Sequence, residues 1–143
     1  MSALNRVLVI GVFDLFHRGH LELLKTASDI GELFVLVNGD SFTEQYKRRP
    51  IINENDRLAI VSSIGFVSYA EITNIPDSKP FINKHGITSI IHGDDWDHES
   101  YLRQICLDDE YISMKGIKMI YTKYYSGVST SGIIKMIRGT CEA

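Results

Sequence analysis

Hydrophobic residues occur along the chain in two alternating patterns. Continuous apolar runs, such as Val7–Ile10 and Leu33–Asn38, are typical of strands buried on both faces of a parallel sheet. Between these runs the apolar positions Leu21, Leu24 and Ala27 recur at helical spacing. The two strands lie only about twenty residues apart, so the pattern predicts one right-handed strand–helix–strand unit.

The rest of the chain repeats this alternation. Shorter apolar runs predict three more strands, at 68–72, 87–92 and 118–121. Helices are expected around these strands, beginning after the N-cap Asn53, ending at His85-Gly86, spanning 101–111, and running from Ser129 or Thr130 to Gly139. The alternation predicts a single domain, residues 1–143. Its fold should be α/β, doubly wound and Rossmann-like, with a parallel sheet of about five strands flanked by helices.

Composition restricts the class of protein. Of the 143 residues, 44% are hydrophobic and 23% are charged, which is ordinary for a globular domain. The net charge of −3 argues against a non-specific nucleic-acid binder, because such proteins are usually basic. Residues 1–6 lack the apolar core of a signal peptide, and no run approaches membrane-spanning length. Cys106 and Cys141 are too few for a disulfide framework, so reduced thiols in a cytoplasm are expected.

The first predicted strand ends in the segment Gly11–His20, where the pattern changes from strand to helix. In an open α/β sheet this edge is the ligand crevice, and the free N–H groups of a helix start favour an anion. His17 and His20 lie there together, which suggests phosphate chemistry. Gly19 is expected to let the backbone approach the phosphates, and Gly11 to leave space below the α-phosphate.

Two other interpretations of the histidine pair stay open. With Asp14, His17 and His20 could bind zinc, although no further Cys or His lies nearby and a helical pair is normally spaced by four residues. They could also be surface histidines without a role. The strand–turn–helix context favours the phosphate interpretation.

A polar and basic stretch, predicted to be a loop, follows the second strand. It runs through Thr43 to Pro50 and contains the consecutive cations Lys47, Arg48 and Arg49. Such a run is often only a solvated loop, but here it follows the same sheet edge as the histidines. Arg57, in the first turn of the next helix, could point to the phosphates or pair with an acid.

The segment Gly11–His20 resembles the H-x-G-H signature of the nucleotidyltransferase superfamily, and its fuller form G-x-F-D-x-x-H-x-G-H resembles the cytidylyltransferase branch. The resemblance implies that His17 and His20 contact the triphosphate and stabilise the transition state. It also implies that the surrounding residues bind the nucleotide: Gly11, Val12, Phe13, Asp14 and Gly19. The family often has Thr where this chain has Val12, so one phosphate hydrogen bond is in question.

Three further motifs extend the resemblance over nearly the whole chain. The basic stretch is similar to the family's flexible loop, which implies that Lys47 closes over the triphosphate, with Arg48 as the alternative, and that Arg57 also points to the phosphates. Residues 93–96, Gly-Asp-Asp-Trp, resemble glycerol-3-phosphate cytidylyltransferases, which implies that Asp94 binds nucleotide and that Asp95 and Trp96 bind the acceptor. His98 and Tyr101 are expected to extend that pocket.

The start of the last helix resembles the family motif R-T-E-G-I-S-T-S. Gly127, Ser129 and Thr130 match it, and the resemblance implies that Ser129 and Thr130 bind the triphosphate. Tyr124 and Tyr125 stand where the family has Arg and Thr, and they are expected to line the acceptor pocket. This departure removes a cation near the phosphates, which Lys123 could replace.

The expected activity is transfer of a cytidylyl group from CTP to a phosphorylated alcohol or polyol, with release of pyrophosphate. The site has no obvious nucleophile with an activating base, so direct in-line attack is expected. Mg²⁺ is the expected cofactor, bridging triphosphate oxygens with help from Asp14 or Asp94. The alternatives are an adenylyltransferase that uses ATP and a nucleotide-binding protein without catalysis. The resemblance also implies a homodimer.

Overall fold

The computed structural model describes residues 5–94, 97–123 and 125–142, with side chains up to residue 139. Its centre is a five-stranded sheet of order β3-β2-β1-β4-β5, in which all neighbouring strands are parallel. The strands are β1 (Arg6–Gly11), β2 (Glu32–Asn38), β3 (Tyr69–Thr73), β4 (Ser89–Gly93) and β5 (Lys118–Thr122). The predicted α/β, doubly wound fold is confirmed. The strand order reverses between β1 and β4, which is where such sheets bind ligands.

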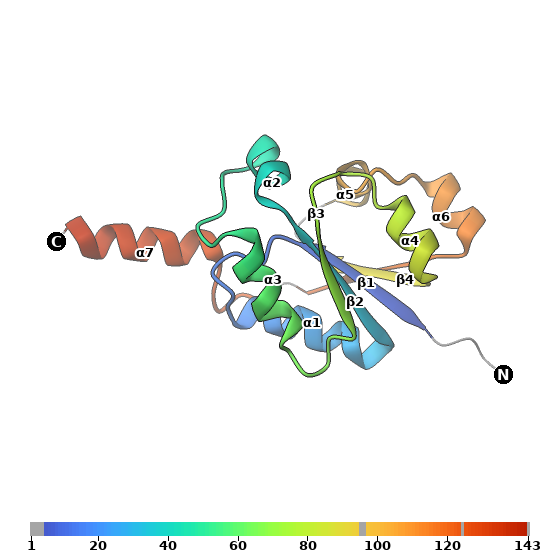
Figure 1. Ribbon diagram of the computed structural model, residues 1–143, viewed down its shortest axis with the longest axis horizontal. Helices are drawn as coiled ribbons and strands as arrows, with labels where there is room; N and C mark the ends of the chain where they lie inside the picture. The colour runs from blue at the N-terminus through green and yellow to red at the C-terminus, as the bar shows by residue number, and fades with distance from the viewer. Residues whose placement is uncertain (1–4, 95–96, 124, 143) are drawn as a thin grey trace.

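Helices cover both faces of the sheet (Figure 1). The helices of the described residues are α1 (Arg18–Ile30), α2 (Asp40–Tyr46), α3 (Glu54–Ser62), α4 (Lys79–His85), α5 (His98–Gln104), α6 (Asp109–Lys115) and α7 (Thr130–Glu142). On one face α1 and α3 bury Leu24, Ala27 and Val61 against β1 and β2. On the other face α4, α5 and α6 bury apolar residues against the same strands. The strands are therefore apolar on both sides, which explains their continuous hydrophobic runs.

The helix expected over 101–111 is instead two helices, and that prediction is wrong. Cys106 adopts φ = +57° between α5 and α6, which a helix cannot contain. Asp108 then starts α6 as its N-cap, accepting a hydrogen bond from the N–H of Tyr111 at 2.7 Å. The buried Leu107 lies in the connection, so an apolar residue there fills the core rather than one face of a continuous helix.

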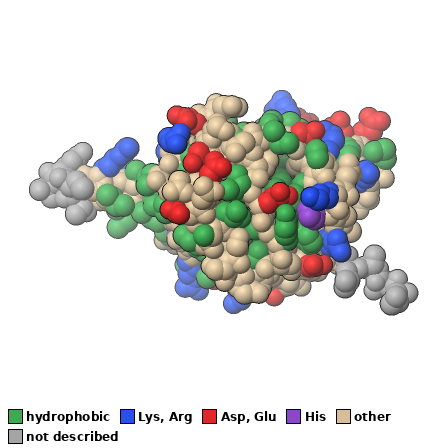
Figure 2. Space-filling view, in the orientation of Figure 1, with side chains coloured by type: hydrophobic (Ala, Val, Ile, Leu, Met, Phe, Trp, Pro, Cys, Tyr) green, Lys and Arg blue, Asp and Glu red, His purple; other side chains and the backbone are tan. Residues whose placement is uncertain are grey.

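Two other boundaries differ from the prediction. The stretch predicted as loop from Thr43 begins inside helix α2, whose Phe42 and Thr43 are buried. The last helix continues through Gly139 to Glu142, because a single exposed glycine inside a helix costs only about 1 kcal/mol. This helix projects from the body of the molecule (Figure 1), and hydrophobic side chains lie along it (Figure 2). Within the described residues, no helix combines the length and the apolar character needed to cross a membrane.

Candidate active site

A cavity of about 460 Å³ opens at the carboxyl edge of the sheet, at the predicted switch point. Its wall contains most of the residues singled out from the sequence: Gly11, Val12, Phe13, Asp14, His17, Gly19, His20, Lys47, Tyr125 and Thr130. Arg48, Tyr101 and Lys123 line it as well. Residues from the H-x-G-H segment, the basic stretch and the start of α7 thus meet at one site although they are far apart in the sequence.

Both histidine rings are held by backbone N–H groups at the start of α1. His17 is the N-cap of α1, and its Nδ1 accepts a hydrogen bond from the N–H of Gly19 at 3.0 Å. The Nδ1 of His20 accepts one from the N–H of His17 at 3.1 Å. An accepting ring nitrogen carries no proton, so these bonds assign the neutral Nε2–H form to both rings. Each ring therefore keeps one N–H donor on Nε2.

Electrostatics favour the same neutral form. Burial, together with the neighbouring His17 and Lys47, lowers the pKa of His20 to about 3, with Asp14 acting in the opposite direction. Burial also lowers the pKa of His17 below its ordinary value. The two rings stack with centroids 3.8 Å apart, which two imidazolium ions would oppose. At neutral pH the pair supplies hydrogen-bond donors rather than cations.

Steric crowding explains why the H-x-G-H segment has a glycine at position 19. A Cβ on Gly19 would lie 2.8 Å from Cε1 of His17, closer than a side chain can approach. Gly19 was expected to make room for phosphates, but in the structure that room is taken by the capping imidazole. Nearby, Phe13 adopts φ = +57°, a conformation that typically costs ~1–3 kcal/mol and is common at functional sites. Its ring covers Gly11, on which a Cβ would lie 3.1 Å from the ring.

Asp14 anchors the segment that follows α2. Its Oδ2 accepts hydrogen bonds from Nη1 of Arg48 (2.9 Å) and the N–H of Ile51 (2.8 Å), and its Oδ1 accepts one from the N–H of Ile52 (2.9 Å). Burial acts to raise the pKa of Asp14, but the hydrogen bonds from Ile51, Ile52 and Arg48 outweigh it and leave the pKa lowered. With its side chain only 3% exposed, this carboxylate holds the loop in place.

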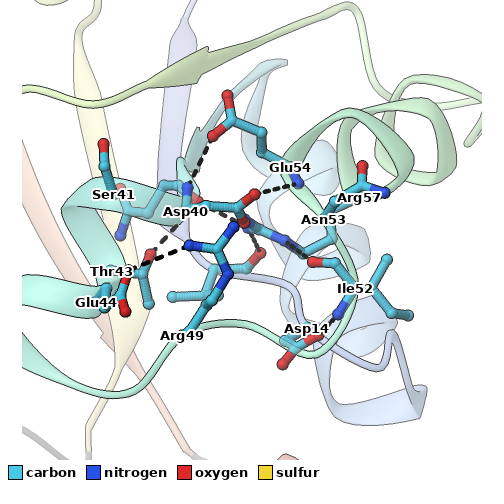
Figure 3. Close-up of polar contacts among 12 residues, drawn as sticks. Asp14, Asp40, Ser41, Thr43, Glu44, Arg49, Ile52, Asn53, Glu54 and Arg57 are labelled. Atoms are coloured by element: carbon cyan, nitrogen blue, oxygen red, sulfur yellow. Dashed lines mark hydrogen bonds and ion pairs between the residues drawn. The ribbon is translucent and has the colours of Figure 1, made fainter.

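Arg57 lies under the site rather than in it, which corrects the expected contact with the phosphates. Its side chain is 0% exposed and does not line the cavity. Nη1 donates to the carbonyls of Val12 and Asn38, both at 2.7 Å, and Nε donates to the carbonyl of Ile52 at 2.8 Å. Nη2 donates to Oδ1 of Asp40 at 2.7 Å (Figure 3). Arg57 joins the ends of β1 and β2 to the loop, so it is a positioning residue.

The loop that carries the basic residues is fixed at its two ends. The starts of α2 and α3 cap each other, because the N–H of Asp40 donates to Oε1 of Glu54 (2.9 Å) and the N–H of Glu54 donates to Oδ2 of Asp40 (3.2 Å) (Figure 3). Asn53 caps α3 as predicted, accepting from the N–H of Asp56 at 3.0 Å. These contacts, with those of Asp14 and Arg57, hold the loop in a defined path and place Lys47 at the cavity.

Comparison with known proteins agrees with this geometry. The family model described as cytidylyltransferase-like matches residues 8–136. The chain belongs to the cytidylyltransferase-like family. It is 30% identical over 139 residues to glycerol-3-phosphate cytidylyltransferase of Bacillus spizizenii, covering 92% of this chain and 96% of that one. It is 35% identical over 105 residues to FAD synthase of Methanocella paludicola, covering 71% and 75%. These relatives place the chain among the nucleotidyltransferases.

Two further similarities concern a longer protein and a solved structure. The bifunctional protein HldE of Campylobacter concisus is 30% identical over 131 residues, or 90% of this chain, which spans about a quarter (26%) of HldE. The crystal structure of a lipopolysaccharide core biosynthesis protein from Thermoplasma volcanium has a TM-score of 0.73 at 28% identity, and covers 87% of this chain and 100% of its own. The cytidylyltransferase-like fold is therefore shared along almost the whole chain.

Some residues expected to bind substrate lie elsewhere in this member of the family. Asp94 is exposed on the turn after β4 and does not line the cavity, so its expected nucleotide contact stays a prediction. Ser129 also lies outside the lining and instead caps α7, accepting from the N–H of Gly132 at 3.0 Å. His98 does not line the cavity either, whereas Tyr101 does. The remaining predicted acceptor residues lie outside the described part of the chain: Asp95, Trp96 and Tyr124.

Thr130 connects α7 to the histidine pair. Its Oγ1 donates to the carbonyl of Asp14 at 3.1 Å and lies 3.3 Å from Nε2 of His17. Because Nε2 carries the proton in the assigned form, it is the donor in this 3.3 Å contact, so His17 cannot act as the base of Thr130 and must give up the contact to donate to a phosphate. Thr130 is therefore not an activated nucleophile, in agreement with the expected direct transfer.

A second group of cavity-lining residues was largely not predicted from the sequence. These are neutral polar and aromatic side chains: Asn38, Thr43, Tyr46, His92, Tyr101 and Gln104. Of these, only Tyr101 had been assigned to the site. The signal that could have found Asn38 and His92 is their position at the carboxyl ends of two predicted strands. Thr43 and Tyr46 were missed because their segment was interpreted as a loop.

The described carboxylates do not form a site for a protein-bound metal. Within residues 5–94, 97–123 and 125–142, no group of three or more His, Cys, Asp or Glu side chains is arranged to hold an ion. Both oxygens of Asp14 are engaged by the loop, and both oxygens of Asp40 are engaged by Arg57 and Glu54. The expected help from Asp14 or Asp94 in binding Mg²⁺ stays a prediction, and for Asp14 it would compete with the hydrogen bonds to the loop.

Proposed function

We propose that the protein transfers a cytidylyl group from CTP to a phosphorylated alcohol or polyol and releases pyrophosphate. The observation that carries the proposal is the pair of neutral Nε2–H donors of His17 and His20 in a cavity that Lys47 and Arg48 also line. Neutral N–H groups and fixed cations stabilise the charge that develops on phosphate oxygens during transfer. The similarity to glycerol-3-phosphate cytidylyltransferase over 92% of the chain supports CTP and a phosphorylated alcohol.

The reaction needs no covalent enzyme intermediate. An oxygen of the acceptor phosphate attacks the α-phosphorus of CTP, and the bond from that phosphorus to the bridging oxygen of the β-phosphate breaks as pyrophosphate leaves. The acceptor phosphate is already anionic, so no general base is required. Holding two anions in line is the main task, and Lys47 and Arg48 offset their mutual repulsion.

Mg²⁺ belongs in this proposal as part of the substrate. A small divalent ion is often held by substrate phosphates and water with few protein ligands. Since the carboxylates of Asp14 and Asp40 are already engaged, we propose that it arrives bound to the triphosphate. A homodimer and a cytoplasmic location stay predictions; the exposed Met136 and Ile137 on the projecting α7 support the former.

ATP is the second candidate donor. The relative with 35% identity is named FAD synthase, and FAD contains an adenine nucleotide. The histidine pair binds phosphates and does not select the base. A protein that binds nucleotide without turnover is the remaining alternative, suggested by Val12 in place of the family's usual threonine.

Pyrophosphate release separates these candidates. The purified protein is incubated with Mg·CTP or Mg·ATP and a panel of phosphorylated alcohols, polyols and sugars, and pyrophosphate is measured with a coupled enzymatic assay. We expect release with CTP and at least one acceptor, and much less with ATP. Higher activity with ATP would identify an adenylyltransferase. Nucleotide binding without release for any acceptor would contradict the proposed reaction.

A further inference from the structure

Tyr46 contributes its side chain to the cavity wall beside the basic stretch. It is the last residue of α2, and Lys47, which follows it, also lines the cavity. The ring of Tyr46 packs against that of Phe42, one helical turn earlier, with centroids 5.1 Å apart. Phe42 is 8% exposed, so this contact anchors the tyrosine ring to the core. The phenol is therefore carried by a packed helix rather than by the loop that follows.

A hydrogen bond from β2 fixes the hydroxyl end of the ring. Nδ2 of Asn38 donates to Oη of Tyr46 at 3.1 Å. Asn38 is 5% exposed, and its carbonyl accepts from Nη1 of Arg57 at 2.7 Å, so the donating residue is itself held in place. With the amide in this orientation Oη is the acceptor, which leaves the phenolic O–H proton for a second bond. Among the described residues, the structure gives that proton no acceptor.

The hydroxyl keeps its proton at neutral pH. Burial raises the pKa of Tyr46 above its ordinary value, although Asn38, Thr43 and Arg57 act in the opposite direction. A protonated phenol is a neutral hydrogen-bond donor, so it can bind an anion without the repulsion that a phenolate would add.

The surroundings of this hydroxyl favour an anionic ligand. Lys47, the next residue, lies near enough to the histidine pair for its charge to lower the pKa of His20. Arg48 also lines the cavity, but its Nη1 donates to Asp14 at 2.9 Å, so part of its charge is already balanced. A neutral donor next to Lys47 therefore adds to the binding of an anion that the cationic charge attracts.

We propose that the hydroxyl of Tyr46 donates a hydrogen bond to a phosphate oxygen of the bound substrates and is a further catalytic residue of this site. This inference rests on the proposed function. The oxygen belongs to the acceptor phosphate or to the triphosphate, which present the same anionic chemistry. Because Phe42 and Asn38 fix the ring, the bond restrains the orientation of that phosphate as well as its position, and in-line transfer depends on orientation.

The test removes only the hydroxyl, in Tyr46→Phe. Calorimetry measures the Kd for Mg·CTP, and the pyrophosphate assay measures the KM for the best acceptor. We expect one of these constants to rise about 10–100-fold, as for loss of a hydrogen bond to a charged group. The thermal midpoint should stay within about 2 °C of wild type. A rise in the acceptor KM assigns the bond to the acceptor phosphate, and a rise in the Kd for Mg·CTP assigns it to the triphosphate.

The matched control is Tyr69→Phe, which makes the same chemical change in β3, outside the cavity lining. The two tyrosines are similarly exposed, at 37% for Tyr46 and 39% for Tyr69. A second variant, Asn38→Leu, removes the bond that anchors the phenol but keeps the phenol itself, so its effect on the same constant should be smaller than that of Tyr46→Phe.

Two results overturn the inference. One is a Kd and a KM in Tyr46→Phe that match those of Tyr69→Phe. The other is an effect of Asn38→Leu as large as that of Tyr46→Phe, because the hydroxyl would then act only by anchoring the end of α2. Pyrophosphate release by the wild-type protein with none of the acceptors contradicts the proposed function instead, and the Kd for Mg·CTP then decides the inference alone.

Discussion

Replacing Arg57 with methionine is expected to destabilise the protein by ~3–5 kcal/mol, because breaking a buried ion pair leaves its partner uncompensated. The guanidinium makes four hydrogen bonds, three to main-chain carbonyls and one to Asp40, whose side chain is 15% exposed. Hydrogen bonds to a charged group contribute about 1.5–3 kcal/mol each, but water reaching the carbonyls would recover part of that sum. Methionine fills much of the volume, so loss of the polar contacts dominates.

Urea unfolding followed by circular dichroism measures this change as a shift in midpoint at constant slope. The control is Arg49→Met, since Arg49 is 66% exposed and pairs only with Glu44, so its loss should cost less than about 1 kcal/mol. Arg57→Met within 1 kcal/mol of the Arg49 variant would refute the structural role. A raised KM for CTP with unchanged stability would instead restore the contact with phosphates suggested by the sequence.

Three further predictions follow from the site. The folded pKa of His20, about 3, lies below its ordinary 6.5. The free energy of unfolding should therefore fall by up to about 2 kcal/mol when the pH is lowered from above 6.5 to about 5. The fall, measured from urea midpoints, should be smaller in His20→Gln. Gly19→Ala should displace the ring of His17 and lower kcat about 10²-fold with little change in the thermal midpoint. Asp14→Asn should release the loop at 47–52 and make its cleavage about tenfold faster in limited proteolysis.

The sheet could be predicted from the sequence because its physical cause is local. Between their first and last residues, β1 and β2 are buried on both faces and carry only apolar side chains, so the pattern is visible without knowledge of the partners. The H-x-G-H segment is also local, since His17 caps the helix that it begins. A short run of residues therefore contains both the turn and the chemistry.

The role of Arg57 could be predicted only in part. Pairing with an acid was one of the two alternatives, and Arg57 does pair with Asp40, but its other partners are carbonyls that carry no side-chain signal. Val12 and Asn38 lie 45 and 19 residues away in the sequence, and any residue type provides the same carbonyl. The cavity-lining residues Thr43 and Tyr46 were missed for a related reason. Helix α2 buries Phe42 and Thr43 in an otherwise polar stretch, which is too few apolar positions to indicate a helix.

The most direct test of the account is the rate of a single turnover in variants of the histidine pair. His17→Ala and His20→Ala are mixed in excess with Mg·CTP and the best acceptor, and product formation is followed by rapid quench, with CTP affinity measured by calorimetry. The account predicts a rate ~10²–10³-fold below wild type in each variant, because each loses one donor to the developing charge, with a much smaller change in affinity. Near-normal rates in both variants, with the fold intact by circular dichroism, would contradict it.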